Sequence, residues 1–122
     1  MKIERGDILI CDFGSQPDYC VQDGIRPAVV VSNNKANQYS PVITVVPLTC
    51  QIQKKRKLPT HVFVPVEKQT GLSRNSMVLA EQVTSIDFRS IVSKVGHVDA
   101  NIMYQISKAV GVQMGLIKIR KV

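Results

Sequence analysis

The sequence has no tryptophan, few aromatic residues and few acidic ones. Aromatic side chains make up 5% of its 122 residues, and 9 acidic residues face 16 basic ones, for a formal net charge of +7. No apolar stretch approaches the roughly 20 residues that span a bilayer, and the N-terminus lacks the apolar segment of a signal peptide. These absences exclude a membrane-spanning protein and predict a cytoplasmic one. With 44% hydrophobic residues, one globular domain over residues 1–122 is expected.

Cysteine is also scarce. Cys11, Cys20 and Cys50 are odd in number and widely spaced, with no C-x-x-C pair. This pattern indicates neither a disulfide framework nor a zinc site, so reduced thiols without a chemical role are expected. A nucleophilic pair of Cys50 with His61 is the less favoured alternative.

The positive charge is concentrated in two short segments. Residues 54–57 carry four positive charges and residues 118–121 carry three, while the remaining basic and acidic residues balance. A basic patch on a neutral body suits a surface that follows phosphates, since neutralised phosphates release counterions. The alternative is a solvated loop and a solvated tail.

Period-two patterns rich in β-branched residues dominate the first two thirds of the chain. They predict strands over residues 7–13, 28–32, 42–48, 60–66, 76–83 and 91–98. Pro65 favours an edge strand, and Gly96 is a candidate bulge. Ser85 or Asp87 is expected to cap a short helical turn.

One amphipathic helix is predicted near the C-terminus. Asp99 is its expected N-cap, and apolar residues recur at spacings of three and four from Ile102 to Met114. Short strands finished by one helix predict a mainly β fold: a small, strongly bent antiparallel sheet or barrel with a C-terminal helix packed on it.

Six short motifs then occur in order along the chain. They are Arg5-Gly6-Asp7-Ile8, Gly24-Ile25-Arg26-Pro27, Tyr39-Ser40-Pro41, Pro47-Leu48-Thr49-Cys50-Gln51, Lys57-Leu58-Pro59-Thr60-His61-Val62, and Glu81-Gln82-Val83 leading into Ser85-Ile86-Asp87. Together they resemble the MazF/PemK toxins of bacterial type II toxin–antitoxin systems. The resemblance implies an SH3-like small barrel of the MazF/PemK/CcdB type. It also implies a homodimer, a cognate antitoxin, and a sequence-specific endoribonuclease that cleaves single-stranded messenger RNA without metal or cofactor.

The resemblance also assigns a catalytic pair, Arg26 and Thr49. In this family the ribose 2′-hydroxyl attacks the adjacent phosphorus and leaves a 2′,3′-cyclic phosphate and a 5′-hydroxyl. A planar guanidinium donates to two phosphate oxygens at once as charge accumulates on them, and a threonine adds a hydroxyl donor. The alternatives are a salt bridge of Arg26 with Asp23 and a turn in which Thr49 binds its own backbone.

Other polar residues are assigned more loosely. Glu81 is the candidate general base, and it is also a candidate for binding a base edge, whereas His61 and His97 are expected to be packed or edge-strand histidines. The candidate RNA-binding residues are Asn33, Asn34, Gln51, Lys54 and Gln82, because amides can read exposed base edges and a lysine attracts phosphate.

The sequence departs from the family pattern in two places. Residues 15–22 do not match the usual loop before Gly-x-Arg-Pro, which affects substrate gating, and residues 83–85 lack a basic residue that many relatives carry. Two other functions stay open at this stage. One is a gyrase-inhibiting toxin of the same fold, and the other is an RNA-binding barrel without catalysis.

Overall fold

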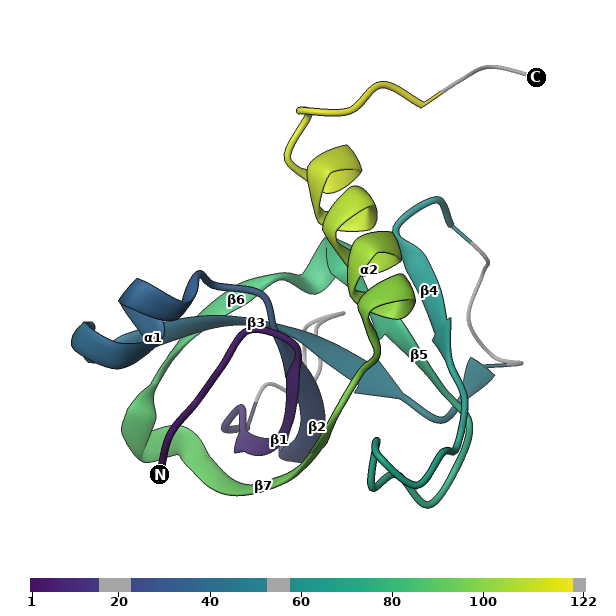
Figure 1. Cartoon of the computed structure of the whole chain (residues 1–122). Coiled ribbons are helices and arrows are strands. Elements are labelled where there is room, and N and C mark those ends of the chain that lie inside the picture. Colours follow the sequence, from purple (N-terminus) through teal and green to yellow (C-terminus); the bar gives the residue numbers. More distant parts are fainter. Residues whose placement is uncertain (16–22, 53–57, 120–122) are drawn as a thin grey trace.

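A bent antiparallel sheet with one long helix packed against it makes up the protein in the computed structural model (Figure 1), which describes residues 1–15, 23–52 and 58–119. The strands are β1 (Asp7–Asp12), β2 (Ile25–Val30), β3 (Val42–Thr49), β4 (His61–Val64), β5 (Ser76–Leu79), β6 (Thr84–Asp87) and β7 (Ile91–His97). The helices are α1 (Asn34–Tyr39), α2 (Ala100–Gln113) and the short 3₁₀ helices η2 (Ala80–Gln82) and η3 (Phe88–Ser90). The predicted mainly β fold with a C-terminal helix is confirmed.

Strand β3 is the centre of the sheet. The strand order is β4-β5-β3-β2-β1-β7, and β6 pairs with β3 outside this path. The first half of β3 pairs with β6, whereas Leu48 and Thr49 at its end pair with β5. The sheet therefore divides at β3, and the end of this strand turns toward β5. This arrangement places Thr49 beside the segment that precedes β5.

Both faces of the central strands are buried. Ile8, Val29 and Val46 belong to an apolar cluster that includes residues of α2, whereas their chain neighbours Leu9 and Val30 belong to a second cluster on the other face. Successive strand residues point to opposite faces, so burial on both faces requires a continuous apolar run. This explains the run over residues 28–32 that predicted the strand.

Helix α2 follows the prediction closely. The Asp99 carboxylate accepts a hydrogen bond from the Ile102 N–H at 2.8 Å and caps the helix, and Ile102, Ile106 and Ala109 are buried against the sheet. The Arg5 guanidinium donates to the Val31 carbonyl and to the Ser107 hydroxyl, which ties the N-terminal segment to this helix. Among the described residues, no helix is long and apolar enough to cross a membrane.

Three elements were not predicted, α1, η2 and β6. Helix α1 has only six residues, too few to show a helical period, and its cap is Asn33, which accepts from the Ala36 N–H at 2.8 Å. The predicted strand over 76–83 is in fact β5 followed by η2, and β6 begins at Thr84. The apolar run of β5 ends at Ala80, and η2 continues with the polar residues Glu81 and Gln82, so three residues of 3₁₀ helix lie inside the predicted strand.

Of the remaining local predictions, those for Asp87, Gly96 and Pro65 agree with the structure and the one for Ser85 does not. Asp87 caps η3 by accepting from the Arg89 N–H at 2.7 Å, whereas Ser85 lies in β6. The pairing of β1 with β7 shifts register beside Gly96, in agreement with the predicted bulge. A side chain on Gly96 would collide with the carbonyl oxygens of Gln69 and Thr70, so glycine is required there. Strand β4 lies at an end of the sheet and stops before Pro65, as expected for an edge strand.

Candidate active site

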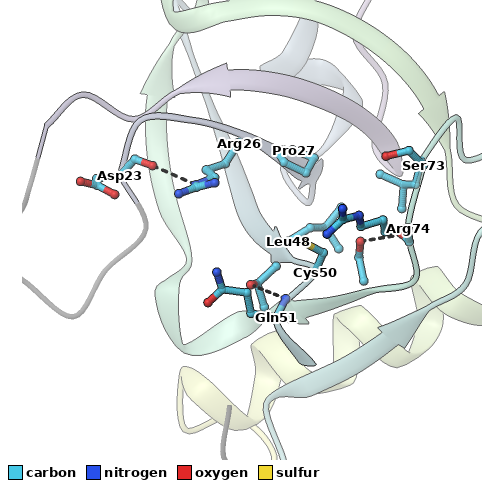
Figure 2. A pocket seen from close by; sticks show the side chains of 11 residues that line it. Asp23, Arg26, Pro27, Leu48, Cys50, Gln51, Ser73 and Arg74 are labelled. Carbon is cyan, nitrogen blue, oxygen red and sulfur yellow. Dashed lines mark hydrogen bonds between the residues drawn. The ribbon is translucent and has the colours of Figure 1, made fainter. Parts of the chain in front are cut away.

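A cavity of about 370 Å³ opens between β2, the end of β3 and the segment leading into β5 (Figure 2). Its lining comes from residues far apart in the chain: Asp23, Arg26, Pro27, Leu48, Thr49, Cys50, Gln51, Leu72, Ser73, Arg74 and Ser76. The cavity brings together Arg26 and Thr49, the two residues assigned as a catalytic pair, and one of the predicted RNA-binding residues, Gln51. Two arginines and one aspartate give the lining a net formal charge of +1.

Arg26 is exposed, and only one of its side-chain nitrogens donates a hydrogen bond to a described residue. It lies in β2 and pairs with Cys11 of β1. The sequence predicted a strand from residue 28, but β2 begins three residues earlier and therefore includes Arg26. Its Nε donates to the main-chain carbonyl of Asp23 at 3.1 Å. The ion pairs among the described residues do not include Arg26, so the salt bridge considered with Asp23 is not formed there. The terminal nitrogens Nη1 and Nη2 have no partner among those residues and can donate to an anion.

Thr49 is the last residue of β3 and is 9% exposed. Its pairing with Met77 of β5 fixes its backbone, and its Oγ1 accepts a hydrogen bond from the Gln51 N–H at 3.2 Å. The predicted alternative, a turn bond to its own backbone, is therefore present. Among residues 1–15, 23–52 and 58–119 the hydroxyl acts only as an acceptor, so none of these residues takes its hydrogen.

Sequence reasoning missed the residues that close the far side of the cavity. Leu72, Ser73 and Arg74 precede β5, and Ser76 is its first residue. No motif marks them, and they reach the cavity only because β5 pairs with the end of β3. A basic side chain in a short polar loop was the one available signal, and it is too common to single out Arg74.

Glu81 lies outside this cavity, in a cluster with Thr60 and His61. The Glu81 carboxylate accepts from the Thr60 hydroxyl at 2.8 Å through Oε1, and its Oε2 lies 2.9 Å from Nε2 of His61. Nδ1 of His61 accepts from the Leu58 N–H at 3.2 Å, so Nε2 carries the hydrogen and donates. The His61 side chain is 3% exposed, as expected for a packed histidine, and both its ring nitrogens are occupied, which excludes the pairing considered with Cys50.

The cluster changes the acidity of its carboxylate. Burial raises the pKa of Glu81, but the hydrogen bonds from His61 and Thr60 outweigh burial, and the net pKa is lowered. Glu81 is therefore held as a charged acceptor. A carboxylate in this state is a weak proton acceptor, because its conjugate acid is stronger than an ordinary glutamic acid.

The other predicted RNA-binding residues are dispersed. Gln82 lines a separate cavity of about 450 Å³ together with Glu81. Asn33 caps α1, and the Asn34 side chain accepts from the Arg5 N–H at 2.6 Å, so the structure places neither of them in the cavity of Arg26. Lys54 and the rest of the basic run lie outside the described residues. His97 is exposed at the end of β7.

The chain has close relatives among known proteins. It is 36% identical over 121 residues to the endoribonuclease EndoA of Bacillus subtilis, covering 96% of this chain and 98% of the relative. It is 33% identical over 118 residues to the endoribonuclease MazF of Staphylococcus saprophyticus, covering 97% of this chain and 96% of the relative.

Solved structures share the fold. The crystal structure of MazF from Deinococcus radiodurans superposes with a TM-score of 0.78 at 22% identity, covering 94% of this chain and 98% of that one. A mycobacterial endoribonuclease in complex with its cognate antitoxin superposes with a TM-score of 0.76 at 24% identity, and the match covers 96% of this chain and 99% of that one. The predicted small-barrel fold of the MazF type is confirmed. The family model of PemK-like, MazF-like toxins of type II toxin–antitoxin systems matches residues 4–114, and the chain belongs to this family.

Proposed function

We propose that this protein is the toxin of a type II toxin–antitoxin system and acts as an endoribonuclease on single-stranded messenger RNA. Membership of the toxin family and the names of the two curated relatives support the activity. The observation that carries the proposal is the cavity that combines Arg26 with Thr49, since both residues line it with donors that no described residue uses.

Arg26 stabilises the charge of the reaction. The ribose 2′-oxygen forms a bond to the adjacent phosphorus while the bond from phosphorus to the 5′-oxygen breaks. Negative charge accumulates on the phosphate oxygens during this step. Nη1 and Nη2 of Arg26 donate to two of those oxygens, and the bond from Nε to the Asp23 carbonyl holds the guanidinium in place.

Thr49 supplies a further donor. Its oxygen already accepts from the Gln51 N–H, which orients the hydroxyl so that its hydrogen faces away from that bond. The free hydrogen donates to the phosphate. Because the nucleophile belongs to the substrate, DNA without a 2′-hydroxyl is not cleaved.

Two proton transfers complete the reaction, and the lining of the cavity decides which carboxylate is near them. The 2′-hydroxyl loses a proton and the 5′-oxygen gains one, so the products are a 2′,3′-cyclic phosphate and a 5′-hydroxyl. Asp23 is the carboxylate among the lining residues, whereas Glu81 lies in the cluster with His61. We therefore assign Glu81 to support of the fold rather than to proton transfer. The amide of Gln51, in the same cavity, reads a base edge.

Partners follow from the same proposal. A solved relative is described in complex with its cognate antitoxin, and we propose an antitoxin for this chain as well. We also propose a homodimer, and action in the cytoplasm, where messenger RNA is found.

The test is cleavage of a mixed single-stranded transcript by the purified protein in EDTA, with the ends of the products mapped. We expect cuts at one short motif, 2′,3′-cyclic phosphate ends, and no cleavage when the ribose at the cut site lacks its 2′-hydroxyl. Binding without cuts indicates the RNA-binding barrel instead. Inhibition of gyrase without cleavage of RNA indicates the gyrase-inhibiting toxin.

A further inference from the structure

The cavity contains a second arginine that the catalytic pair does not use. Arg74 lies on the segment between β4 and β5 and is exposed. Its guanidinium has no hydrogen bond or ion pair with the residues that the structure describes, and Asp23 is the one carboxylate in the described lining. Five N–H donors therefore face a cavity whose net charge is positive, which is the environment of an anion site.

The backbone that carries Arg74 is held in place. The Ser76 hydroxyl donates to the Arg74 carbonyl at 3.0 Å, and the Asn75 side chain accepts from the Val66 N–H at 2.8 Å. Ser76 is buried and begins β5. The chain is thus tied at Arg74 to β5 and at Asn75 to the residue two positions after β4, and the base of the arginine side chain has a defined position although its tip contacts none of the described residues.

The two arginines lie on opposite sides of the cavity. In Figure 2, Arg26 and Asp23 lie on one side, Arg74 and Ser73 on the other, and Leu48 and Cys50 between them. If Arg26 and Thr49 hold the scissile phosphate, as proposed above, the Arg74 side of the cavity remains for another group. A single-stranded chain that crosses the cavity presents a further phosphate there.

We propose that Arg74 binds a phosphate of the RNA backbone that flanks the scissile one, as a second anion subsite of the same cavity. This inference rests on the proposed function. The flanking phosphate carries the same charge in the ground state and in the transition state. Arg74 therefore contributes to substrate binding and not to the chemical step, and it is a binding residue without sequence preference.

The experiment compares Arg74→Gln and Arg74→Lys with a matched control, Arg89→Gln. Arg89 is exposed and pairs with Asp87, away from the cavity. Steady-state cleavage of a single-stranded RNA that the parental protein cuts is measured at several salt concentrations. Arg74→Gln is expected to raise KM by about tenfold or more with kcat within about twofold, because a charge-assisted hydrogen bond is lost.

The salt dependence separates binding from a structural effect. Arg74→Gln should reduce the slope of log affinity against log salt by about 0.7, the value for one phosphate contact of a single strand. Arg74→Lys keeps the charge and should keep the slope with a smaller rise in KM. The cleavage motif and the control variant should match the parent.

Each contrary result points to a different error. An unchanged KM and slope in Arg74→Gln overturns the inference, and so does a loss confined to kcat, which places Arg74 at the scissile phosphate. A parental protein that cuts no RNA instead overturns the proposed function. Far-UV circular dichroism confirms that the variants are folded before these comparisons are made.

Discussion

Two polar clusters of this protein differ in how many of their hydrogen-bonding groups have a partner among the described residues. In the cavity, the side chains of Arg26 and Thr49 each make one hydrogen bond with the described residues and have further donors that none of those residues uses. In the cluster of Glu81, His61 and Thr60, both carboxylate oxygens and both ring nitrogens have partners inside the protein. The first cluster is prepared for a ligand, and the second is complete without one.

This difference teaches that a motif residue is not by itself a site residue. The Glu-Gln motif and the Gly-x-Arg-Pro motif are equally visible in the sequence. In the described part of the chain, only the second one contributes residues to the cavity that also contains Thr49. Unused donors signal binding, while satisfied and buried groups signal stability, because burying an unpaired polar group is costly.

The largest effect is expected from Arg26→Ala. This variant removes both donors to the scissile phosphate, and removal of one such donor typically costs 10²- to 10³-fold, so we expect cleavage to fall by at least about 10³-fold. The melting temperature should stay within about 2 °C, because Arg26 is exposed. Single-turnover kinetics measure the cleavage rate, and thermal unfolding measures the melting temperature. Arg89→Ala is the control, and a parental rate in Arg26→Ala would remove this residue from the site.

A smaller effect is expected from Thr49→Val, which keeps the shape and removes the hydroxyl. We expect kcat to fall by about 10²-fold, the low end for loss of one donor. Thr49→Ser should restore most of the rate, and Thr44→Val on the same strand should have no effect, because Thr44 lies outside the cavity. If serine does not rescue kcat, the hydroxyl is not the group that acts.

Glu81→Gln should act on stability instead of rate. Glutamine has one acceptor oxygen in place of two, so the hydrogen bond from Thr60 or the one from His61 is weakened or lost. We therefore expect the free energy of unfolding in urea to fall by about 1–3 kcal/mol. The kcat of the folded protein should remain within about twofold of the parent. Glu4→Gln, which removes an exposed pair with Lys2, is the matched control. A variant of full stability and lost activity would return Glu81 to the role of general base.

The smallest effect is a dependence of this stability on pH. The folded protein lowers the pKa of Glu81 from its ordinary value of 4.5, so the ionised carboxylate favours folding. Its contribution is complete above about pH 4.5 and is lost as the pH falls through the lowered pKa. The stability difference between the parent and Glu81→Gln should therefore shrink between pH 6 and pH 3 in urea titrations. A difference that is constant over this range would contradict the stated cause.

Some features of the site could be predicted because they are local. The patterns of apolar residues identified β1, the second half of β2 and all of β3 except Thr49, and β2 and β3 are the strands that carry Arg26 and Thr49. The spacing of apolar residues after Asp99 identified α2. Helix α1 and β6 were missed, since six and four residues are too few to establish a period.

The amino-acid sequence by itself determined the fold class and the family and suggested the proposed catalytic pair, because alternation, capping and motifs are properties of neighbouring residues. Only the tertiary structure decided which polar groups share a cavity. The pairing of β5 with the end of β3 brought Arg74 to Thr49 across 25 positions of the chain, while the partners of Glu81 and Asn34 were settled by packing of distant segments. Contacts of this kind depend on strand register, and no pattern within a short window of sequence records that register.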